Sequence, residues 1–438
     1  MDWWGRACRV TGLEAQEREV GLFGETPLIM IEDTESLEAM VAGLMSTPII
    51  GVDTEADSFH HYQEQLCLIQ LSDLNQDYIV DPLKIEDCSS LQKLLSRPDL
   101  VTLLHGGDYD VVSMKRDFGI TFANIFDTMI ASLFLGLPRI GLADLIETNF
   151  GFHIDKRYQR HDWSSRPLLE EHLHYARGDT HFLHALQEIL TLKLKRAGRF
   201  DAFEEECAIL TQREWTGRTR DPSDFMRVKR SRTLDIEGRR VLRALWVWRE
   251  ARAQVVDRPV FKVLSDSIMI AIASGRPTNE DGLHEVIRRG STLSRKHGGE
   301  LLKAVSDGLA DDRPLPKAPA KPRKRAAQRS GPGMDQYLGP LKEWRNNLVK
   351  KKKLSPVVVV NNQLLKDISR VAPSTLEDLA EVPGIRRWQV VDFGEDILEI
   401  VSGVPRPTKS RKRKRRRGSK PTSDVPSAES PPSAESPA

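Results

Sequence analysis

The chain has 438 residues, of which 39% are hydrophobic and 29% charged, so it is long enough for two or three domains with proper cores. Its four cysteines are scattered without a Cys-x-x-Cys pair, which argues against a disulfide framework and a thiolate zinc site. Apolar stretches fall short of the roughly 18 residues of a membrane span, and the first residues lack the apolar core of a signal peptide. We therefore expect a cytoplasmic protein.

Strand and helix signals alternate through the first half of the chain. Residues 1–25 show no periodicity and are expected to form a disordered extension, and residues 26–205 are expected to form the first domain. The expected strands are 26–31, 49–54, 66–71, 77–80, 101–105 and 123–127, and the expected helices are 36–44, 91–95, 109–118 and 169–196. Short connections between the early strands favour antiparallel pairing. Later alternation of helix and strand completes a mixed α/β sheet.

Two helical units follow the first domain. Residues 206–312 and 334–404 share a loose plan, in which a Trp-Arg helix is followed by a basic loop, a capped helix and a Pro/Gly turn. This plan indicates a diverged internal repeat. A basic Pro/Ala linker is expected at 313–333, and a disordered tail, first basic and then rich in Ser, Pro and Glu, at 405–438.

The net charge of +2 conceals an acidic body and a basic tail. Basic runs at 350–353 and 409–417 could contact phosphates, and each could equally be a solubilising or targeting segment.

Two carboxylates end an apolar strand signal at Ile49–Thr54. Asp53 and Glu55 are two residues apart, so in a strand they point to the same face. Carboxylates held side by side repel each other unless a proton or a cation lies between them, and a hard divalent cation such as Mg²⁺ takes oxygen ligands. An isolated Asp-x-Glu more often ends a strand in a polar turn.

Two further acidic elements lie downstream. A strand signal ends at His105, two glycines follow, and Asp110 falls in the first turn of the next helix. Taken alone, that aspartate favours the N-terminus of the helix. Tyr175 and Asp179 are four residues apart and share one helix face, which could be solvated surface or could present a ligand beside a group that orients water.

In this order, the three elements resemble the exonuclease motifs of the DEDD family, and Tyr175 is typical of its tyrosine subclass. The flanking residues are closer to ribonuclease D, and both helical units resemble HRDC domains. The residues that carry this likeness are Leu66–Ser72, Phe126–Thr128, Lys156–Gln159, Asp162–Trp163, Arg166–Leu168 and Asp179–Leu183. The resemblance implies a ribonuclease H-like exonuclease domain with a mixed sheet, followed by two small all-α domains.

The resemblance also implies 3′→5′ exonuclease chemistry with two divalent cations, Mg²⁺ or Mn²⁺. Asp53, Glu55, Asp110 and Asp179 would hold the metals, and Tyr175 would position the attacking water. Two cations can generate hydroxide and stabilise the leaving oxygen. Tyrosine is a poor candidate for the base, because its ordinary pKa is about 10.

Three residues are expected to bind substrate, namely Thr54, His105 and Lys156. His105 could equally be a histidine satisfied beside its helix, and Lys156 a plain surface lysine. Asp127 is interpreted as a structural residue beneath the site. Ala56 stands where many relatives carry a bulky apolar residue that wedges against the terminal base.

The expected activity is hydrolysis of RNA from its 3′ end to nucleoside 5′-monophosphates, with tRNA precursors as the expected substrates. RNA rather than DNA follows from the resemblance alone, so a DNA 3′→5′ exonuclease is the first alternative. An inactive adaptor that binds nucleic acid through its helical modules is the second. The complete set of four carboxylates and the tyrosine argues against the adaptor.

Overall fold

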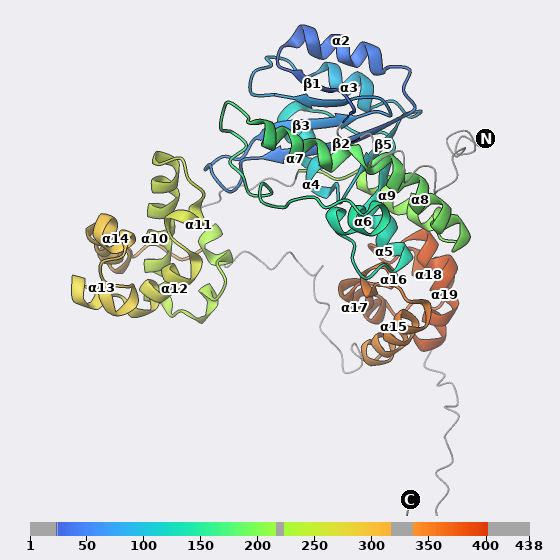
Figure 1. Ribbon diagram of the computed structural model, residues 1–438. Coiled ribbons are helices and arrows are strands. Elements are labelled where there is room, and N and C mark those ends of the chain that lie inside the picture. The colour runs from blue at the N-terminus through green and yellow to red at the C-terminus, as the bar shows by residue number, and fades with distance from the viewer. Residues whose placement is uncertain (1–22, 24, 216–222, 317–335, 402–438) are drawn as a thin grey trace, which may run out of the picture.

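The structure is a computed structural model that describes residues 23, 25–215, 223–316 and 336–401 (Figure 1). A mixed six-stranded sheet has the order β1-β4-β3-β2-β5-β6. The strands are β1 (Leu28–Ile31), β2 (Ile49–Ala56), β3 (Leu66–Ser72), β4 (Asp77–Val80), β5 (Val101–Leu104) and β6 (Ile125–Asp127). β3 is antiparallel to both β2 and β4, whereas β1 with β4, β2 with β5 and β5 with β6 are parallel. The predicted mixed sheet, with early antiparallel strands, is confirmed.

Eight helices accompany the sheet among the residues described before position 216. They are α2 (Thr34–Leu44), α3 (Ser90–Leu95), α4 (Asp108–Phe118), α5 (Thr128–Leu135), α6 (Leu142–Phe150), α7 (Glu170–His181), α8 (Leu183–Arg196) and α9 (Phe200–Leu210). The single helix predicted over 169–196 is two helices, because the chain breaks at the fully buried Phe182. α5, α6 and α9 were not predicted.

Each face of the sheet has its own hydrophobic core. Leu37 of α2, Leu91 of α3 and Met114 of α4 pack on one face, where Ile50 and Val52 of β2 also point. α7 and α8 cover the other face (Figure 1). Gly51 lets α7 approach β2 closely, since a Cβ there would lie 3.0 Å from the carbonyl oxygen of Thr180. β2 is thus enclosed on both faces at the centre of the sheet.

Two predicted boundaries of this sheet domain need correction. Phe23 belongs to the segment expected to be disordered, yet it is only 3% exposed and stacks against Phe182 with ring centroids 5.1 Å apart. Residues 1–22 and 24 lie outside the described residues. The boundary predicted at 205/206 falls inside α9, whose Phe203 and Cys207 both pack into the sheet-domain core. An amphipathic helix whose apolar side packs there belongs to this domain along its whole length.

The first helical module comprises α10 (Ile236–Val255), α11 (Val260–Val263), α12 (Asp266–Gly275), α13 (Glu280–Val286) and α14 (Thr292–Ala310). The second comprises α15 (Leu338–Lys352), α16 (Pro356–Val359), α17 (Asn362–Val371), α18 (Leu376–Ala380) and α19 (Arg387–Val401). The tail predicted to be disordered, and all of the predicted linker after residue 316, lie outside the described residues. Among the helices of the described ranges, none has the length and apolar character needed to cross a membrane.

Matching contacts show that the second module repeats the first. Trp248 donates its indole N–H to Glu300, 52 residues later, and Trp344 donates to Asp396, also 52 residues later. The next residue in each module, Arg249 or Arg345, donates to backbone and side-chain oxygens 15 and 17 residues further on. Identical spacings in two separate cores confirm the predicted internal repeat.

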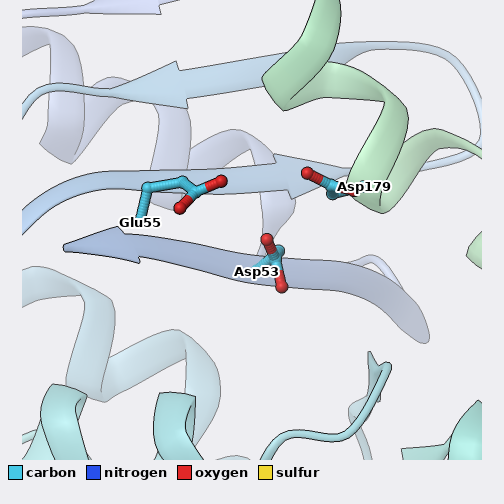
Figure 2. A group of neighbouring side chains, drawn as sticks. All are labelled: Asp53, Glu55 and Asp179. Carbon is cyan, nitrogen blue, oxygen red and sulfur yellow. The ribbon is translucent and has the colours of Figure 1, made fainter. Parts of the chain in front are cut away.

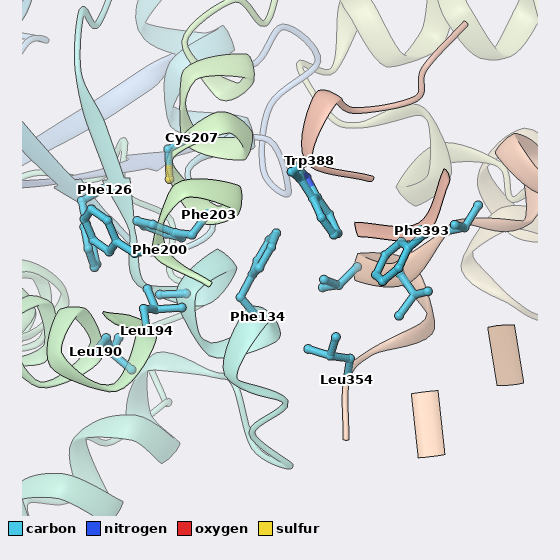
Figure 3. Close-up of a cluster of buried hydrophobic side chains, with 14 of the residues drawn as sticks. Phe126, Phe134, Leu190, Leu194, Phe200, Phe203, Cys207, Leu354, Trp388 and Phe393 are labelled. Carbon is cyan, nitrogen blue, oxygen red and sulfur yellow. The ribbon is translucent and has the colours of Figure 1, made fainter. Parts of the chain in front are cut away.

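The second module shares a hydrophobic core with the sheet domain. Phe134 of α5 contacts Trp388 of α19 with ring centroids 5.3 Å apart, and Leu354 and Phe393 continue the cluster (Figure 3). At the end of α5, Gly136 has φ +68°, and a Cβ there would lie 1.7 Å from the carbonyl oxygen of Lys353. Glycine is therefore required where the turn after α15 meets the sheet domain.

Several polar contacts join the first module to the sheet domain. Asp257, in the turn after α10, accepts hydrogen bonds from the His61 ring at 2.6 Å and from the Tyr62 N–H at 3.0 Å. The Tyr62 hydroxyl donates to Glu250 of α10 at 3.3 Å. The loop after β2 therefore carries this contact.

Candidate active site

The acidic pair of the first motif lies at the end of the central strand β2. Ile49, Ile50 and Val52 favour an extended chain, and β2 pairs with β3 on one side and β5 on the other. Asp53 is opposite Gln70, Glu55 is opposite Leu68, and the register shifts directly after Glu55. As predicted from their spacing, the two carboxylates point to the same face of the sheet, the face that α7 covers.

The third carboxylate comes from α7. Asp179 brings an oxygen to Asp53 and Glu55 such that one ligand atom from each lies within 4.8 Å of the other two (Figure 2). The three side chains converge although α7 is more than a hundred residues from β2 in the sequence. Three partly buried carboxylates from two elements offer the hard oxygen donors that Mg²⁺ and Mn²⁺ take.

The electrostatics of this cluster favour positive charge. Burial, followed by the charges of Asp110, Asp179 and Glu55, raises the pKa of Asp53 well above its ordinary value. Burial and the nearby Asp110 raise the pKa of Asp179 to about 7, and the pKa of Glu55 is also raised, chiefly by burial. Like charges gathered in a poorly solvated site are stabilised by protons or by a cation. The donor set and its charge thus both fit divalent metal ions.

Asp110 approaches from the opposite side of β2. It lies in the first turn of α4, and its Oδ1 accepts a hydrogen bond of 2.5 Å from the Thr54 hydroxyl. Burial raises its pKa to about 6, despite the lowering effect of that hydrogen bond. Two glycines make the tight turn before α4 possible, because Gly106 has φ +71° and a Cβ on Gly107 would lie 2.4 Å from the Leu104 side chain.

Tyr175 stands one helical turn before Asp179 on α7 and is held by aromatic neighbours. Its ring stacks on the buried Trp163 with centroids 5.9 Å apart, and Tyr158 meets it edge-on at 6.0 Å. Burial and the neighbouring carboxylates, Asp179 first, raise the pKa of the phenol. The hydroxyl therefore stays protonated and can donate a hydrogen bond.

The residues predicted to bind substrate lie in different settings. Thr54 is buried and bonded to Asp110. His105 contacts the Thr128 hydroxyl at 2.9 Å, and burial lowers its pKa to about 4, so this neutral ring is satisfied within the fold. Lys156 is exposed between α6 and α7. Asp127 has the structural role predicted for it, since it caps α5 and accepts the Gly107 N–H at 2.8 Å.

Sequence reasoning missed the buried ion pairs that hold α7 and Trp163 in place. Asp77 of β4 accepts two hydrogen bonds from Arg177 and one from His181, both on α7. Burial opposes the charge of Asp77, yet the hydrogen bond and charge of His181, the hydrogen bond from Ser72 and the charge of Arg177 hold its pKa below the ordinary value. Arg166 similarly pairs with the buried Asp81 and donates to the Trp163 carbonyl. The Arg166-Pro167-Leu168 stretch was a visible signal without an assigned role.

Family comparisons match the architecture. Residues 28–195 match the 3′-5′ exonuclease family, and residues 238–305 and 335–401 each match the HRDC domain. The exonuclease match covers the sheet together with β2, α4 and α7, which carry the acidic side chains. The two HRDC matches fall on the two helical modules.

Individual relatives extend over most of the chain. The ribonuclease D of Gluconacetobacter diazotrophicus is 30% identical over 379 residues, which are 86% of this chain and 93% of that protein. The ribonuclease D of Desulfotalea psychrophila is 30% identical over 64% of this chain and 75% of that protein.

Solved structures agree. The structure of Escherichia coli RNase D, described as an exoribonuclease involved in structured RNA processing, superimposes with a TM-score of 0.62 at 25% identity, covering 86% of this chain and 99% of that one. The catalytic core of RRP6 from Trypanosoma brucei gives a TM-score of 0.56 at 30% identity, over 66% of this chain and 81% of that one. Sequence, fold and acidic cluster agree, and the chain belongs to the ribonuclease D family of 3′→5′ exoribonucleases.

Proposed function

We propose that Asp53, Glu55, Asp110 and Asp179 hold two divalent cations, Mg²⁺ or Mn²⁺, in this exoribonuclease. The observation that carries the proposal is the convergence of Asp53, Glu55 and Asp179 within 4.8 Å. Asp110 would complete the set from the far side of β2, with Thr54 fixing its carboxylate. When bound, such ions activate a water and stabilise the leaving oxygen of an in-line displacement.

The chain's own residues position the reactants. Tyr175 keeps its proton, so it orients the attacking water by a hydrogen bond and does not remove a proton from it. The rings of Trp163 and Tyr158 pack against the Tyr175 ring and hold it in one orientation. Lys156, exposed on the segment before α7, would contact a backbone phosphate of the RNA. Thr54 and His105 act indirectly, through their bonds to Asp110 and Thr128.

The proposed substrates are RNAs with a free 3′ end, with tRNA precursors as the first candidates, and the products are nucleoside 5′-monophosphates. The support is the likeness to ribonuclease D over 93% of one relative and the described role of the E. coli protein in structured RNA processing. A cytoplasmic location remains a prediction from the sequence.

The test is a 5′-labelled single-stranded RNA incubated with the full chain and Mg²⁺ or Mn²⁺. We expect a ladder that shortens from the 3′ end, abolished by EDTA and by Asp53→Ala. A matched DNA strand, run in parallel, tests the DNA alternative, and a precursor tRNA with a 3′ extension tests the substrate class. Degradation that survives EDTA and Asp53→Ala would refute the metal site.

A further inference from the structure

Two exposed phenylalanines meet where the first helical module contacts the exonuclease domain. Phe59, in the loop after β2, is 48% exposed, and Phe261 of α11 is 52% exposed. Their ring centroids are 6.4 Å apart and their planes cross at 75°. α11 lies on the side of its module that faces the exonuclease domain (Figure 1). The exposed faces of these two rings form an apolar surface at the junction of two domains, where a ligand could bind.

Polar contacts hold the two rings at this position. The loop that carries Phe59 is tied to the first module by the bonds of His61 and Tyr62 to Asp257. The same loop is tied to the segment before α7, because the His60 ring contacts the Arg160 carbonyl at 3.0 Å and the His61 ring contacts the Ser164 hydroxyl at 2.8 Å. The positions of the rings therefore do not depend on their contact with each other.

Three basic residues accompany the two rings. The Arg160 guanidinium lies over the Phe59 ring, 5.8 Å from its centroid. Arg258, just before α11, and Lys262, within α11, are exposed, and the acids Asp257 and Glu250 of the same module are bonded to His61 and Tyr62. Exposed cations interleaved with aromatic rings are the pattern that binds single-stranded nucleic acid, because the cations follow the phosphates while the bases stack.

The rings are also close to the acidic cluster. Phe59 is four residues after Glu55, so the two Cα atoms are at most about 14 Å apart. Ala56, Asp57 and Ser58 lie between them, and Phe59 is the first residue of this loop with a face on which a base can stack.

We propose that Phe59 and Phe261 form a stacking site for bases of the single-stranded RNA segment just upstream of the 3′ end, with Arg160 and Lys262 contacting its phosphates. The proposal rests on the proposed function and adds a binding site that joins the catalytic domain to the first HRDC module. On this proposal the acidic cluster alone holds a dinucleotide, and only a longer strand also contacts the two rings.

The experiment compares Phe59→Ala, Phe261→Ala and the matched aromatic variants Phe59→Trp and Phe261→Trp in the full chain. Leu74→Ala is the control, because Leu74 is 67% exposed in the turn after β3, at the opposite end of the sheet. Affinity for a ten-nucleotide RNA carrying one fluorescent 2-aminopurine is measured in EDTA, with the analogue moved stepwise from the 3′ end. kcat/KM is measured with Mg²⁺ on that RNA and on a dinucleotide.

We expect each alanine variant to bind the ten-nucleotide RNA about fivefold to a hundredfold more weakly, as loss of one stacked base predicts. Quenching of the analogue should peak a few nucleotides from the 3′ end and disappear in Phe59→Ala. The tryptophan variants and Leu74→Ala should bind like the wild type, and dinucleotide hydrolysis should stay within twofold for all variants.

Unchanged affinity in both alanine variants would overturn the stacking site. An equal loss on dinucleotide and long RNA, or an expanded particle in small-angle X-ray scattering, would also overturn it, because the rings would then serve the catalytic centre or the domain contact. If the wild type hydrolyses neither RNA, the proposed function fails, while the binding measurement in EDTA still decides the stacking site.

Discussion

Replacing Asp53 by asparagine should make the metal-free protein more stable while abolishing its activity. Asp53, Glu55 and Asp179 present oxygens within 4.8 Å of one another. Two unit charges at that distance repel by about 3.5 kcal/mol at an effective dielectric constant near 20. Protonation limits this cost in the folded protein, so we expect Asp53→Asn to raise the unfolding free energy by about 2 kcal/mol, roughly 4–8 °C in the apparent melting temperature.

The pH dependence of that gain has a defined sign. The pKa of Asp179 is about 7 in the folded protein against an ordinary 3.8, so the folded state binds this proton more tightly than the unfolded state. Wild-type stability therefore rises as pH falls from 8 through 7, and the advantage of the variant shrinks. At pH 8 the advantage should be largest.

The assay is thermal unfolding of wild type and Asp53→Asn in EDTA at pH 8 and at pH 5.5, repeated with Mn²⁺ at pH 8. Mn²⁺ should raise the melting temperature of the wild type but not that of Asp53→Asn, because the variant lacks a ligand of the site. Glu86→Gln, which removes an exposed acid after β4, is the control and should match the wild type both in stability in EDTA and in its response to Mn²⁺. An asparagine variant that is less stable than wild type in EDTA at pH 8 would refute the electrostatic reasoning.

Three further predictions concern other parts of the molecule. Tyr175→Phe should lower kcat about a hundredfold and leave the Mn²⁺-induced thermal shift unchanged, since only the water-orienting hydroxyl is lost; a lost thermal shift would contradict this. Gly136→Ala and Gly151→Ala both place alanine at a φ near +70°, at a cost of about 1–2 kcal/mol, but only the former should release the second module in limited proteolysis, because only Gly136 faces Lys353. The bond to Asp257 raises the pKa of His61 above 6.5 and lowers that of Asp257 below 3.8. The His61–Asp257 pair therefore stabilises the folded protein fully between about pH 3.8 and 6.5, and this stabilisation is lost as pH rises through the folded pKa of His61. Small-angle scattering should show the first module loosening at high pH in the wild type, and no such pH dependence in His61→Gln.

The central strand and the spacing of its acids could be predicted because both are local. Alternation in β2 sets the side on which Asp53 and Glu55 lie, and four residues on a helix set Tyr175 above Asp179. The sheet was predictable for the same reason, since its early strands are joined by short connections. The sequence reasoning placed α4 correctly because two glycines precede its first turn.

The missed features depend on contacts between distant residues. The pairing of Asp77 with Arg177 joins β4 to α7 across 100 residues, and neither residue alone signals it. α9 and Phe23 were missed because their apolar side chains pack against residues that are distant in the sequence. The break at Phe182 likewise reflects tertiary packing, since the helical pattern runs through it without interruption.

The two copies of the helical module contact the exonuclease domain through the same turn, but in different ways. Asp257 and Lys353 each follow the Trp-Arg helix of their module, each has positive φ, and each meets the exonuclease domain. In the second copy, the Lys353 carbonyl packs against Gly136, and the module shares one apolar core with the exonuclease domain. This copy is therefore firmly attached to the enzyme. The first copy meets the domain through a few hydrogen bonds, which salt and pH can weaken, and through the contact of Phe59 with Phe261. The two copies of one module thus differ in how firmly they are attached to the exonuclease domain, although both are attached through the same turn.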